Sequence, residues 1–263
     1  MKRFHAIEFE DLSWFPKSWR DYGTDYLRFV AVKFDIFSHI APIIERGLDA
    51  SKQNDWIDCA SGGGGGLINL ADKIKRNRPD LKIMLTDYYP NIQAFELTKK
   101  TNETVFDFEK NSIDAKELPQ NFNGKFRTMF GSFHHFRPKD AQQILQNAID
   151  HNAPIAIFEP VGRNFASFFS MLFVILNVVL LTPFIRPVRW SVLPFIYLIP
   201  LVPLFILWDG IASIFRTYSE KELKELITKL NKSEHFEWEI GSKRKGPIPM
   251  QYLLGIPVIK KSN

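Results

Sequence analysis

The sequence predicts an α/β fold, in which a doubly wound, mostly parallel sheet ends in a terminal antiparallel pair. Short apolar runs alternate with amphipathic helical patterns between residues 55 and 162, as parallel strands joined by helices do. Each run ends in an acidic or glycine-containing stretch. Two more strand patterns follow each other closely before the C-terminus. An apolar stretch at 163–216 interrupts this order and is predicted to be an inserted helical hairpin.

The alternation gives five parallel strands, the third of which is expected to end at Asp114. The strand ranges are 55–58, 81–87, 104–115, 125–136 and 154–162. Helices are expected at 27–48, with Gly47 as a stop signal, and at 66–77, 90–100 and 138–151. Ser219 is a suitable N-cap for a further helix. It opens a C-terminal part with a helix at 219–230 and strands at 236–242 and 251–259.

Residues 1–28 are rich in aromatic and charged side chains. They are expected to be irregular, because Pro16 and Gly23 interrupt helical patterns. Two roles remain open for this segment. As a lid over a binding site it would bring Tyr22 and Asp25 near the ligand; otherwise it is an ordinary arm packed on the domain.

Five consecutive glycines, 62–66, follow the first strand and precede a helical pattern. Glycine permits positive φ and lets the backbone approach a ligand closely. The helix start behind the glycines offers free N–H groups and a partial positive charge. A flexible linker is the alternative, but linkers are flanked by polar sequence. The carboxyl ends of parallel strands also meet at one edge, so this turn and the later strand ends predict a nucleotide-type site.

Two cofactor classes suit such a turn. A nicotinamide dinucleotide requires a third glycine in G-x-G-x-x-G, and after Gly62 and Gly64 that place is taken by Leu67. S-adenosylmethionine needs a glycine turn near its amino-acid end and a carboxylate for its ribose, which Asp87 at the second strand end can supply. The later strand ends therefore favour S-adenosylmethionine.

The glycine motif and its order with the later strands resemble those of the class I S-adenosylmethionine-dependent methyltransferases. The first motif of that family maps onto Asp58, Ala60, Gly62 and Gly64, with Ala60 where glycine is usual. The resemblance implies a Rossmann-like methyltransferase fold with S-adenosyl-L-methionine as cofactor. It covers roughly residues 50–162 and 217–260.

Further cofactor contacts are implied by the same resemblance. Asp87 matches the ribose-binding acid, and Tyr88 beside it could cover the adenine. Asp114 and Ala115 resemble the segment that binds the adenine amino group. Ser132 belongs to the stretch GSFHHF at 131–136, which is similar to the fourth motif of the family.

Candidate catalytic residues are His134, His135 and Glu159. Methyl transfer from a sulfonium mainly requires positioning and desolvation of the reactants. A base is needed only if the acceptor carries a proton with a high pKa. Histidine suits that role near neutral pH. The alternatives are a structural, hydrogen-bonded histidine and a Glu159 that serves as its strand-end partner.

The inserted stretch contains two 17-residue apolar runs, 165–181 and 192–208, at the lower length limit for a membrane span. Three interpretations remain open. The first is a pair of transmembrane helices with Arg186 and Arg189 in the outer loop. The second is a shallow hairpin with these arginines at headgroup level. The third is a soluble apolar cap over a hydrophobic pocket, or a dimer surface. We expect association with a membrane, with the catalytic domain on the cytoplasmic side. An apolar or lipid-like acceptor, dissolved in the membrane, would follow.

Composition limits the other function classes. The formal charge of +5 is too mild to indicate a nucleic-acid partner. Cys59 is the only cysteine, so it forms no intramolecular disulfide, and no metal site is predicted. The remaining alternatives are a non-catalytic nucleotide-fold membrane protein and a nicotinamide-dependent oxidoreductase. The expected parts are an N-terminal arm and helix, a cofactor-binding core, an apolar hairpin and a C-terminal part, at 1–48, 49–162, 163–216 and 217–263.

Overall fold

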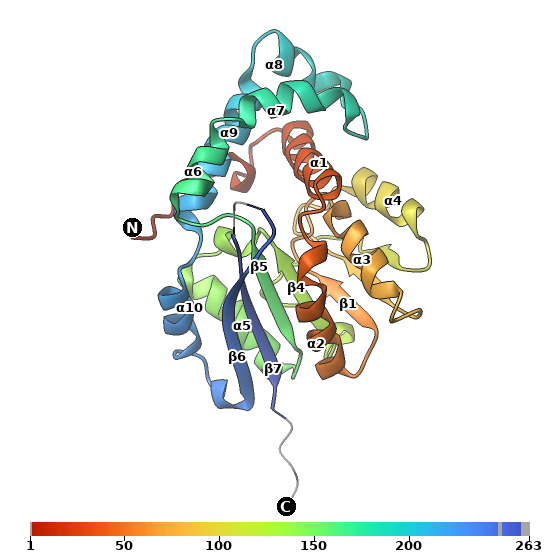
Figure 1. The fold of residues 1–263 in the computed structure, drawn as a ribbon, viewed down its shortest axis with the longest axis vertical. Helices are drawn as coiled ribbons and strands as arrows, with labels where there is room; N and C mark the ends of the chain where they lie inside the picture. Colours follow the sequence, from red (N-terminus) through yellow and green to blue (C-terminus); the bar gives the residue numbers. More distant parts are fainter. Residues whose placement is uncertain (1, 247–248, 259–263) are drawn as a thin grey trace, which may run out of the picture.

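A seven-stranded sheet forms the centre of the molecule in the computed structural model, which describes residues 2–246 and 249–258. Its strand order is β3-β2-β1-β4-β5-β7-β6 (Figure 1). The first five strands run parallel, and β7 pairs antiparallel with both β5 and β6. This is the predicted mixed sheet. Its strands are Asp55–Asp58 (β1), Lys82–Leu85 (β2), Phe106–Phe108 (β3), Phe126–Phe130 (β4), Ile155–Glu159 (β5), Phe236–Arg244 (β6) and Pro249–Pro257 (β7).

Helices cover both faces of the sheet, because successive strand side chains point to opposite sides. Trp56 packs with α2, α3 and α4 on one face, while Ile57 packs with α5 and α10 on the other. These helices span Ala41–Ser51 (α2), Ile68–Lys75 (α3), Ile92–Thr101 (α4), Pro138–Asp150 (α5) and Glu220–Ile227 (α10). The capping box that Ser219 forms with Glu222 fixes the start of α10.

The N-terminal segment differs from its prediction. Helix α1 runs unbroken over Lys17–Lys33, so the expectation of an irregular segment broken at Gly23 is wrong there. Pro16 stands at the N-cap, where a proline does not disturb a helix. Gly23 is tolerated because the Glu10 side chain occupies the space that a Cβ would need.

The helix expected at 27–48 is divided in two. Asp35 adopts a φ of +48°, and α2 begins only at Ala41. Gly47 does not stop α2; it lies inside the helix, where a Cβ would collide with the Phe126 ring. Packing thus explains this glycine better than helix termination does.

The third strand is shorter than predicted. β3 ends at Phe108, and Asp114 lies in the loop that follows. That loop returns to the sheet, because the Ile113 amide donates to the Asp87 carbonyl. In β7, the last expected residue, 259, lies outside the described residues.

The inserted stretch folds into α6 (Phe165–Met171), α7 (Val174–Leu181), α8 (Pro194–Tyr197) and α9 (Leu201–Arg216). These helices form the apolar cap, which packs on α1 around a hydrophobic core that includes Val178, Ile196 and Phe205 (Figure 1). Pro194 and Pro200 mark helix starts in the cap, as expected from their effect on helices.

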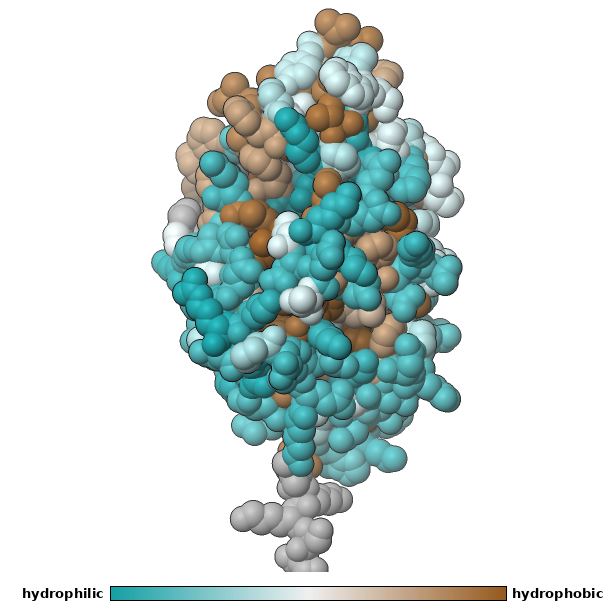
Figure 2. Space-filling model, turned by 90° about the vertical axis from the view of Figure 1, so that its right-hand side faces the viewer, coloured by the Kyte–Doolittle hydropathy of each residue, from teal (hydrophilic) through white to brown (hydrophobic). Residues whose placement is uncertain are grey.

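Within the described ranges, no single helix has the length and apolar character needed to cross a membrane. Two bent pairs meet the test by length and composition, with bends of 46° and 84°. The cap leaves large apolar side chains exposed: Phe165, Phe169, Leu172, Leu176, Leu180, Phe184, Trp190 and Leu198. We call this set the exposed apolar face. In the side view, hydrophobic residues gather at the cap end and the opposite end is largely hydrophilic (Figure 2).

The loop between α7 and α8 does not carry both arginines outward. Arg189 turns inward, where its Nε lies 2.6 Å from Asp25 Oδ2 and its Nη1 lies 3.2 Å from Asp21 Oδ2. Only Arg186 is exposed. The placement of both arginines in an outer loop or at headgroup level is therefore wrong for Arg189, because two buried carboxylates of α1 neutralise it.

Candidate functional site

A cavity of about 610 Å³ lies at the carboxyl edge of the sheet, between the strand ends and the apolar cap. Strands β1, β2 and β4 and the loops after them form one wall. The opposite wall comes from α1, α6, α9 and the N-terminal segment. All nine predicted cofactor residues line this cavity: Asp58, Ala60, Gly62, Gly64, Asp87, Tyr88, Asp114, Ala115 and Ser132. His134 and His135 also line it.

The loop after β1 has positive φ at every second residue: +52° at Ala60, +54° at Gly62 and +66° at Gly64. Only glycine adopts this region without strain, so Gly62 and Gly64 are required by the turn, and Ala60 bears the cost of a Cβ there. A short 3₁₀ turn at Gly65–Leu67 then leads into α3.

Two further glycines of the run are explained by α1. A Cβ on Gly63 would lie 2.6 Å from the Thr24 carbonyl oxygen, and one on Gly65 would lie 2.5 Å from Arg28 Cδ. The backbone of the glycine loop therefore packs directly against α1. A Cβ on Gly66 would make only ordinary contacts of 3.4 Å, and nothing in the structure explains why glycine stands there.

Asp87 holds the glycine loop against the end of β2. Its Oδ2 accepts the Gly62 amide at 2.7 Å and its Oδ1 accepts the Tyr89 amide at 2.8 Å. Each carboxylate oxygen keeps a further lone pair for a ligand hydroxyl. Burial raises the pKa of Asp87, and the two amides oppose that shift.

Asp58 lies deeper, at the end of β1, and it is 3% exposed. Its Oδ1 accepts the Thr128 hydroxyl at 2.7 Å. Burial raises its pKa to about 7 although this hydrogen bond lowers it. Among the described residues, no cationic side chain forms an ion pair with Asp58. A cationic ligand group would therefore find an acid here that lacks a partner.

The other predicted cofactor residues surround the same space. Tyr88 is 54% exposed at the cavity mouth. Asp114 Oδ1 accepts the Lys116 amide at 2.9 Å, which fixes the loop that carries Ala115. Ser132 is buried, and its Oγ finds no hydrogen-bond partner in the described part of the chain. This unpaired hydroxyl fits a polar ligand, so the residues present fit a nucleoside cofactor.

His134 is fixed in place by Glu159, the last residue of β5. Glu159 Oε1 accepts the His134 amide at 3.0 Å, and Oε2 lies 2.9 Å from His134 Nδ1. Glu159 itself does not line the cavity; it lies behind the ring. The other ring nitrogen, Nε2, points away from Glu159 and has no hydrogen-bond partner among the residues described.

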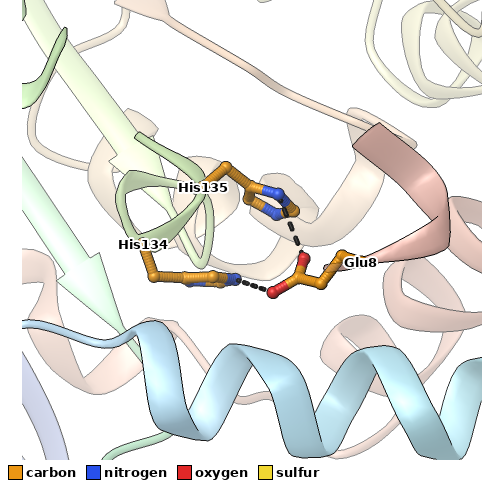
Figure 3. Close-up of side chains that lie close together, drawn as sticks. All are labelled: Glu8, His134 and His135. Carbon is orange, nitrogen blue, oxygen red and sulfur yellow. Dashed lines mark ion pairs between the residues drawn. The ribbon is translucent and has the colours of Figure 1, made fainter. Parts of the chain in front are cut away.

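His135 stacks on His134, with ring centroids 4.4 Å apart. It faces two carboxylates from the N-terminal segment, because its Nδ1 lies 2.8 Å from Asp11 Oδ1 and 3.1 Å from Glu8 Oε2. Burial favours the neutral ring, but Glu8 and Asp11 outweigh it and raise the pKa of His135 to about 10. The Glu8 carboxylate lies beside the stacked pair, with one oxygen toward each ring (Figure 3).

The acidic residues of this wall were missed by sequence reasoning. Glu8, Glu10 and Asp11 come from the N-terminal segment and Asp209 from α9, and all four line the cavity. Asp209 accepts the amides of Phe9 and Glu10. Burial, together with repulsion from the carboxylate of Asp209, raises the pKa of Glu10 to about 8. The only signal in the sequence is the acidic stretch EFED at 8–11, which has no motif spacing.

Tyr22 and Asp25 do not reach the site, as they would in a lid that carried them to the ligand. Tyr22 bonds to the Thr182 hydroxyl at 2.6 Å, and Asp25 bonds to Arg189 and Asn91. Neither lines the cavity; Gly23 and Thr24 of the same helix do. α1 thus covers the site with its glycine-containing face, while its acidic face holds the cap.

No family model and no curated protein matches the chain. Solved structures do. A protein from Nostoc punctiforme described as an O-methyltransferase superposes with a TM-score of 0.50 and 12% identity, over 88% of this chain and 59% of its own. The chain thus spans about three fifths of that protein.

Two more structures are similar at lower scores. Magnesium protoporphyrin IX methyltransferase from Synechocystis, with bound S-adenosylhomocysteine, gives a TM-score of 0.48 and 13% identity over 91% of this chain and 98% of that one. A plantazolicin methyltransferase gives 0.46 and 13% over 89% and 95%. At such identities the likeness concerns the fold, which is that of the methyltransferases.

Proposed function

We propose that the protein is an S-adenosylmethionine-dependent methyltransferase. The observation that carries this proposal is one cavity lined by the positive-φ glycine loop, by acids at the ends of β1 and β2, and by a histidine pair at the end of β4. Elements distant in the sequence supply these groups. The methyltransferase-type fold supports the same function.

The roles follow from position. Gly62 and Gly64 let the backbone approach the amino-acid end of the cofactor, and Asp58 offsets its positive charge. Asp87 accepts the ribose hydroxyls, with Tyr88 over the adenine. Asp114 and Ala115 meet the adenine amino edge, and Ser132 donates to a cofactor oxygen.

When bound, the cofactor supplies a sulfonium carbon that is already activated for displacement. The chain then has to align the acceptor and exclude water, which the apolar cap does by closing the cavity. The acceptor reacts beside His134 and His135, with Glu159 as the positioning residue. The proton of an acceptor hydroxyl has two routes: Nε2 of His134 accepts it, or a cation held by both histidines makes the hydroxyl acidic enough to lose it to solvent.

A nicotinamide-dependent oxidoreductase is disfavoured by Leu67. This residue stands where the third glycine would allow close helix packing, and its side chain is buried in the core. A non-catalytic binding module would show cofactor affinity without turnover.

Calorimetric titration tests the cofactor. We expect S-adenosylhomocysteine to bind and NADH not to bind. Asp87→Ala should weaken S-adenosylhomocysteine binding by about 10- to 100-fold, since hydrogen bonds to a charged group are lost. The control is Asp107→Ala, an exposed aspartate of β3 that contacts Lys99 rather than the cavity. Undetectable binding, or unchanged affinity in Asp87→Ala, would refute the methyltransferase.

The acceptor is proposed to be an apolar or lipid-like molecule that the protein takes from a membrane surface. The exposed apolar face supports this, because large apolar side chains gathered at one end of a molecule are typical of an interaction surface. It adjoins the cavity: Met171 of α6 and Ile206 of α9 line that space. Bent helices suit shallow insertion, with α6–α9 in the interface and the core on the cytoplasmic side.

Vesicle sedimentation tests this attachment. Wild-type protein should sediment with phosphatidylcholine–phosphatidylglycerol vesicles. The double variant Phe165→Asp/Leu198→Asp should be bound at least about fivefold less, since each side chain buries apolar area worth roughly 1.5–3 kcal/mol. Val258→Asp, an exposed apolar position that follows β7, is the matched control. Wild-type protein that stays in the supernatant would contradict membrane attachment.

A further inference from the structure

Four side chains in the cavity wall converge from two distant parts of the sequence: Glu8, Asp11, His134 and His135. We call them the His–carboxylate cluster. His134 Nε2 lies 3.8 Å from Glu8 Oε1, and His135 Nδ1 lies 3.1 Å from Glu8 Oε2 and 2.8 Å from Asp11 Oδ1 (Figure 3). One donor atom each from Glu8, His134 and His135 lie within 4.8 Å of one another.

His134 is oriented as a metal ligand would be. A metal-binding histidine usually donates its other ring N–H to a carboxylate, which fixes the tautomer and makes the free nitrogen more basic. Here Glu159 occupies that place, 2.9 Å from Nδ1. The remaining Nε2 is buried, faces Glu8, and has no hydrogen-bond partner in the described ranges. A buried nitrogen left without a partner is costly, and a cation would satisfy it.

Glu8 is fixed from behind. It is 1% exposed, and its Oε1 accepts from Ser213 Oγ at 3.2 Å and lies 3.3 Å from Arg216 Nη1. Arg216 also binds Asp11 Oδ2 at 2.5 Å, which leaves Asp11 Oδ1 for the histidine side. These contacts fix both carboxylates beside His135 Nδ1.

The charges of this wall are unbalanced. Glu8, Asp11 and Glu159 are three acids, whereas Arg216 is the cation that pairs with Glu8 and Asp11. A divalent cation would add positive charge beside these acids, and buried charges need such compensation.

We propose that Glu8, His134 and His135 bind a divalent transition-metal ion such as Zn²⁺, with Asp11 next to His135. Two imidazoles and carboxylates are the donor set of zinc and its neighbours, whereas Mg²⁺ and Ca²⁺ prefer oxygen ligands alone. Donors at roughly 2.0–2.2 Å from a tetrahedral ion lie about 3.4 Å apart. The separations to Glu8 oxygens, 3.1 and 3.8 Å, are on either side of that value.

The use of this ion rests on the proposed function. It would bind the acceptor through an oxygen and lower the pKa of a hydroxyl, as zinc does with water. The hydroxyl proton passes to solvent. An oxygen lone pair then forms the bond to the methyl carbon, while the carbon–sulfur electron pair stays on sulfur and leaves a neutral thioether. The acceptor class is thus a hydroxyl compound, such as a phenol or an enol.

Metal binding is measured without turnover. Chelator-treated full-length protein is titrated with Zn²⁺ in a calorimeter and, after dialysis against Zn²⁺, analysed for metal content. We expect one ion per chain with a Kd on the order of 1 μM or tighter. Glu8→Gln and His134→Gln should each bind at least about 100-fold more weakly. His235→Gln, at a half-buried histidine outside the cavity, should match wild type within about twofold.

Cobalt gives a second readout. Co²⁺-loaded wild type should show visible d–d bands that His134→Gln lacks, and circular dichroism would show that the variant is folded. If His134→Gln does not fold, Glu8→Gln decides, because its amide keeps the shape of the carboxylate. Wild type that binds neither ion, or Glu8→Gln that binds Zn²⁺ as tightly as wild type, would overturn the site.

Titration of metal-free protein with S-adenosylhomocysteine separates this site from the proposed function. Because the cluster contains none of the residues assigned to the cofactor, we expect the affinity for S-adenosylhomocysteine to be unchanged. Zn²⁺ binding without S-adenosylhomocysteine binding would refute the methyltransferase but leave the metal site. The reverse result would refute the metal site and leave His134 as the proton acceptor.

Discussion

The α/β core and the apolar cap form opposite walls of one cavity, but they position their groups differently. In the core, the groups that line the cavity lie at or just after the end of a strand, so the register of the sheet determines their position. In the cap and the N-terminal segment, groups are held by buried ionic contacts between distant residues, such as Glu8 with Arg216 and Asp25 with Arg189. The core wall is therefore fixed by topology, and the cap wall depends on a few charge pairs.

Removing Arg189 is the strongest test of that difference. Arg189→Met leaves Asp25 buried without its cation. Burial already raises the pKa of Asp25 to about 6 although Arg189 lowers it. Breaking a buried pair from one side costs about 3–5 kcal/mol, so we expect a loss of that size in the free energy of unfolding, measured in urea.

One control variant and one rescue variant complete this test. Arg186→Met in the same loop should cost less than about 0.5 kcal/mol, because its side chain is exposed. Asp25→Asn added to Arg189→Met should recover part of the loss. Equal costs for the two arginine variants would show that charge pairing does not hold the cap.

Two alanine substitutions in the glycine loop test the core, with a smaller expected loss of stability. At Gly64, alanine would carry φ +66° and place its Cβ 2.7 Å from the Phe95 ring. Left-handed strain and overpacking predict a loss of about 2–4 kcal/mol. Gly66→Ala has neither problem and should stay within about 0.5 kcal/mol of wild type or gain slightly. Similar thermal stability in both variants would contradict the assigned roles.

The smallest effect concerns pH. A pKa near 7 leaves Asp58 protonated in mildly acid solution. Cationic cofactor groups favour the ionised form, so S-adenosylhomocysteine affinity should rise with pH and level off above about 7. The change should be up to about tenfold between pH 6 and 7. Asp58→Asn should flatten this profile in calorimetry, and an unaltered slope would assign the dependence to another group.

The same raised pKa makes the stability of the unliganded protein fall with pH, whereas ligand affinity rises. The contribution of Asp58 to folding stability is fully present below the unfolded-state pKa near 4. It is lost as the pH rises through about 7. Thermal stability of Asp58→Asn without ligand should therefore fall less over this interval than that of wild type.

The sequence is informative where a group lies next to the element that places it. Asp58, Gly62, Asp87 and Ser132 each follow a strand within a few residues, and all line the cavity. Asp114 reaches it too, although β3 ends earlier than expected, because the loop pairs with Asp87. Strand pattern and turn chemistry are local signals, and they predicted this wall.

The remaining wall has no local signal. Glu8 is 126 residues before His134, and nothing in its neighbours indicates burial. The helix propensity of glycine predicts a break at Gly23, but tertiary packing keeps this residue within α1. Arg189 lies in an apolar stretch where an outward position was expected, and only the fold reveals Asp25 beside it. Long-range charge pairs of this kind are set by three-dimensional proximity alone.

The contact between the glycine loop and α1 has a kinetic consequence. Thr24 and Arg28 lie against the backbone of Gly63 and Gly65 with no room for a Cβ, and α1 is fixed in turn to the cap by Arg189. A nucleoside seated on that loop would lie next to α1, so lifting of α1 would ease its departure. Where release of the spent cofactor limits turnover, the residence time of the cofactor would report on a helix that takes no part in the chemistry.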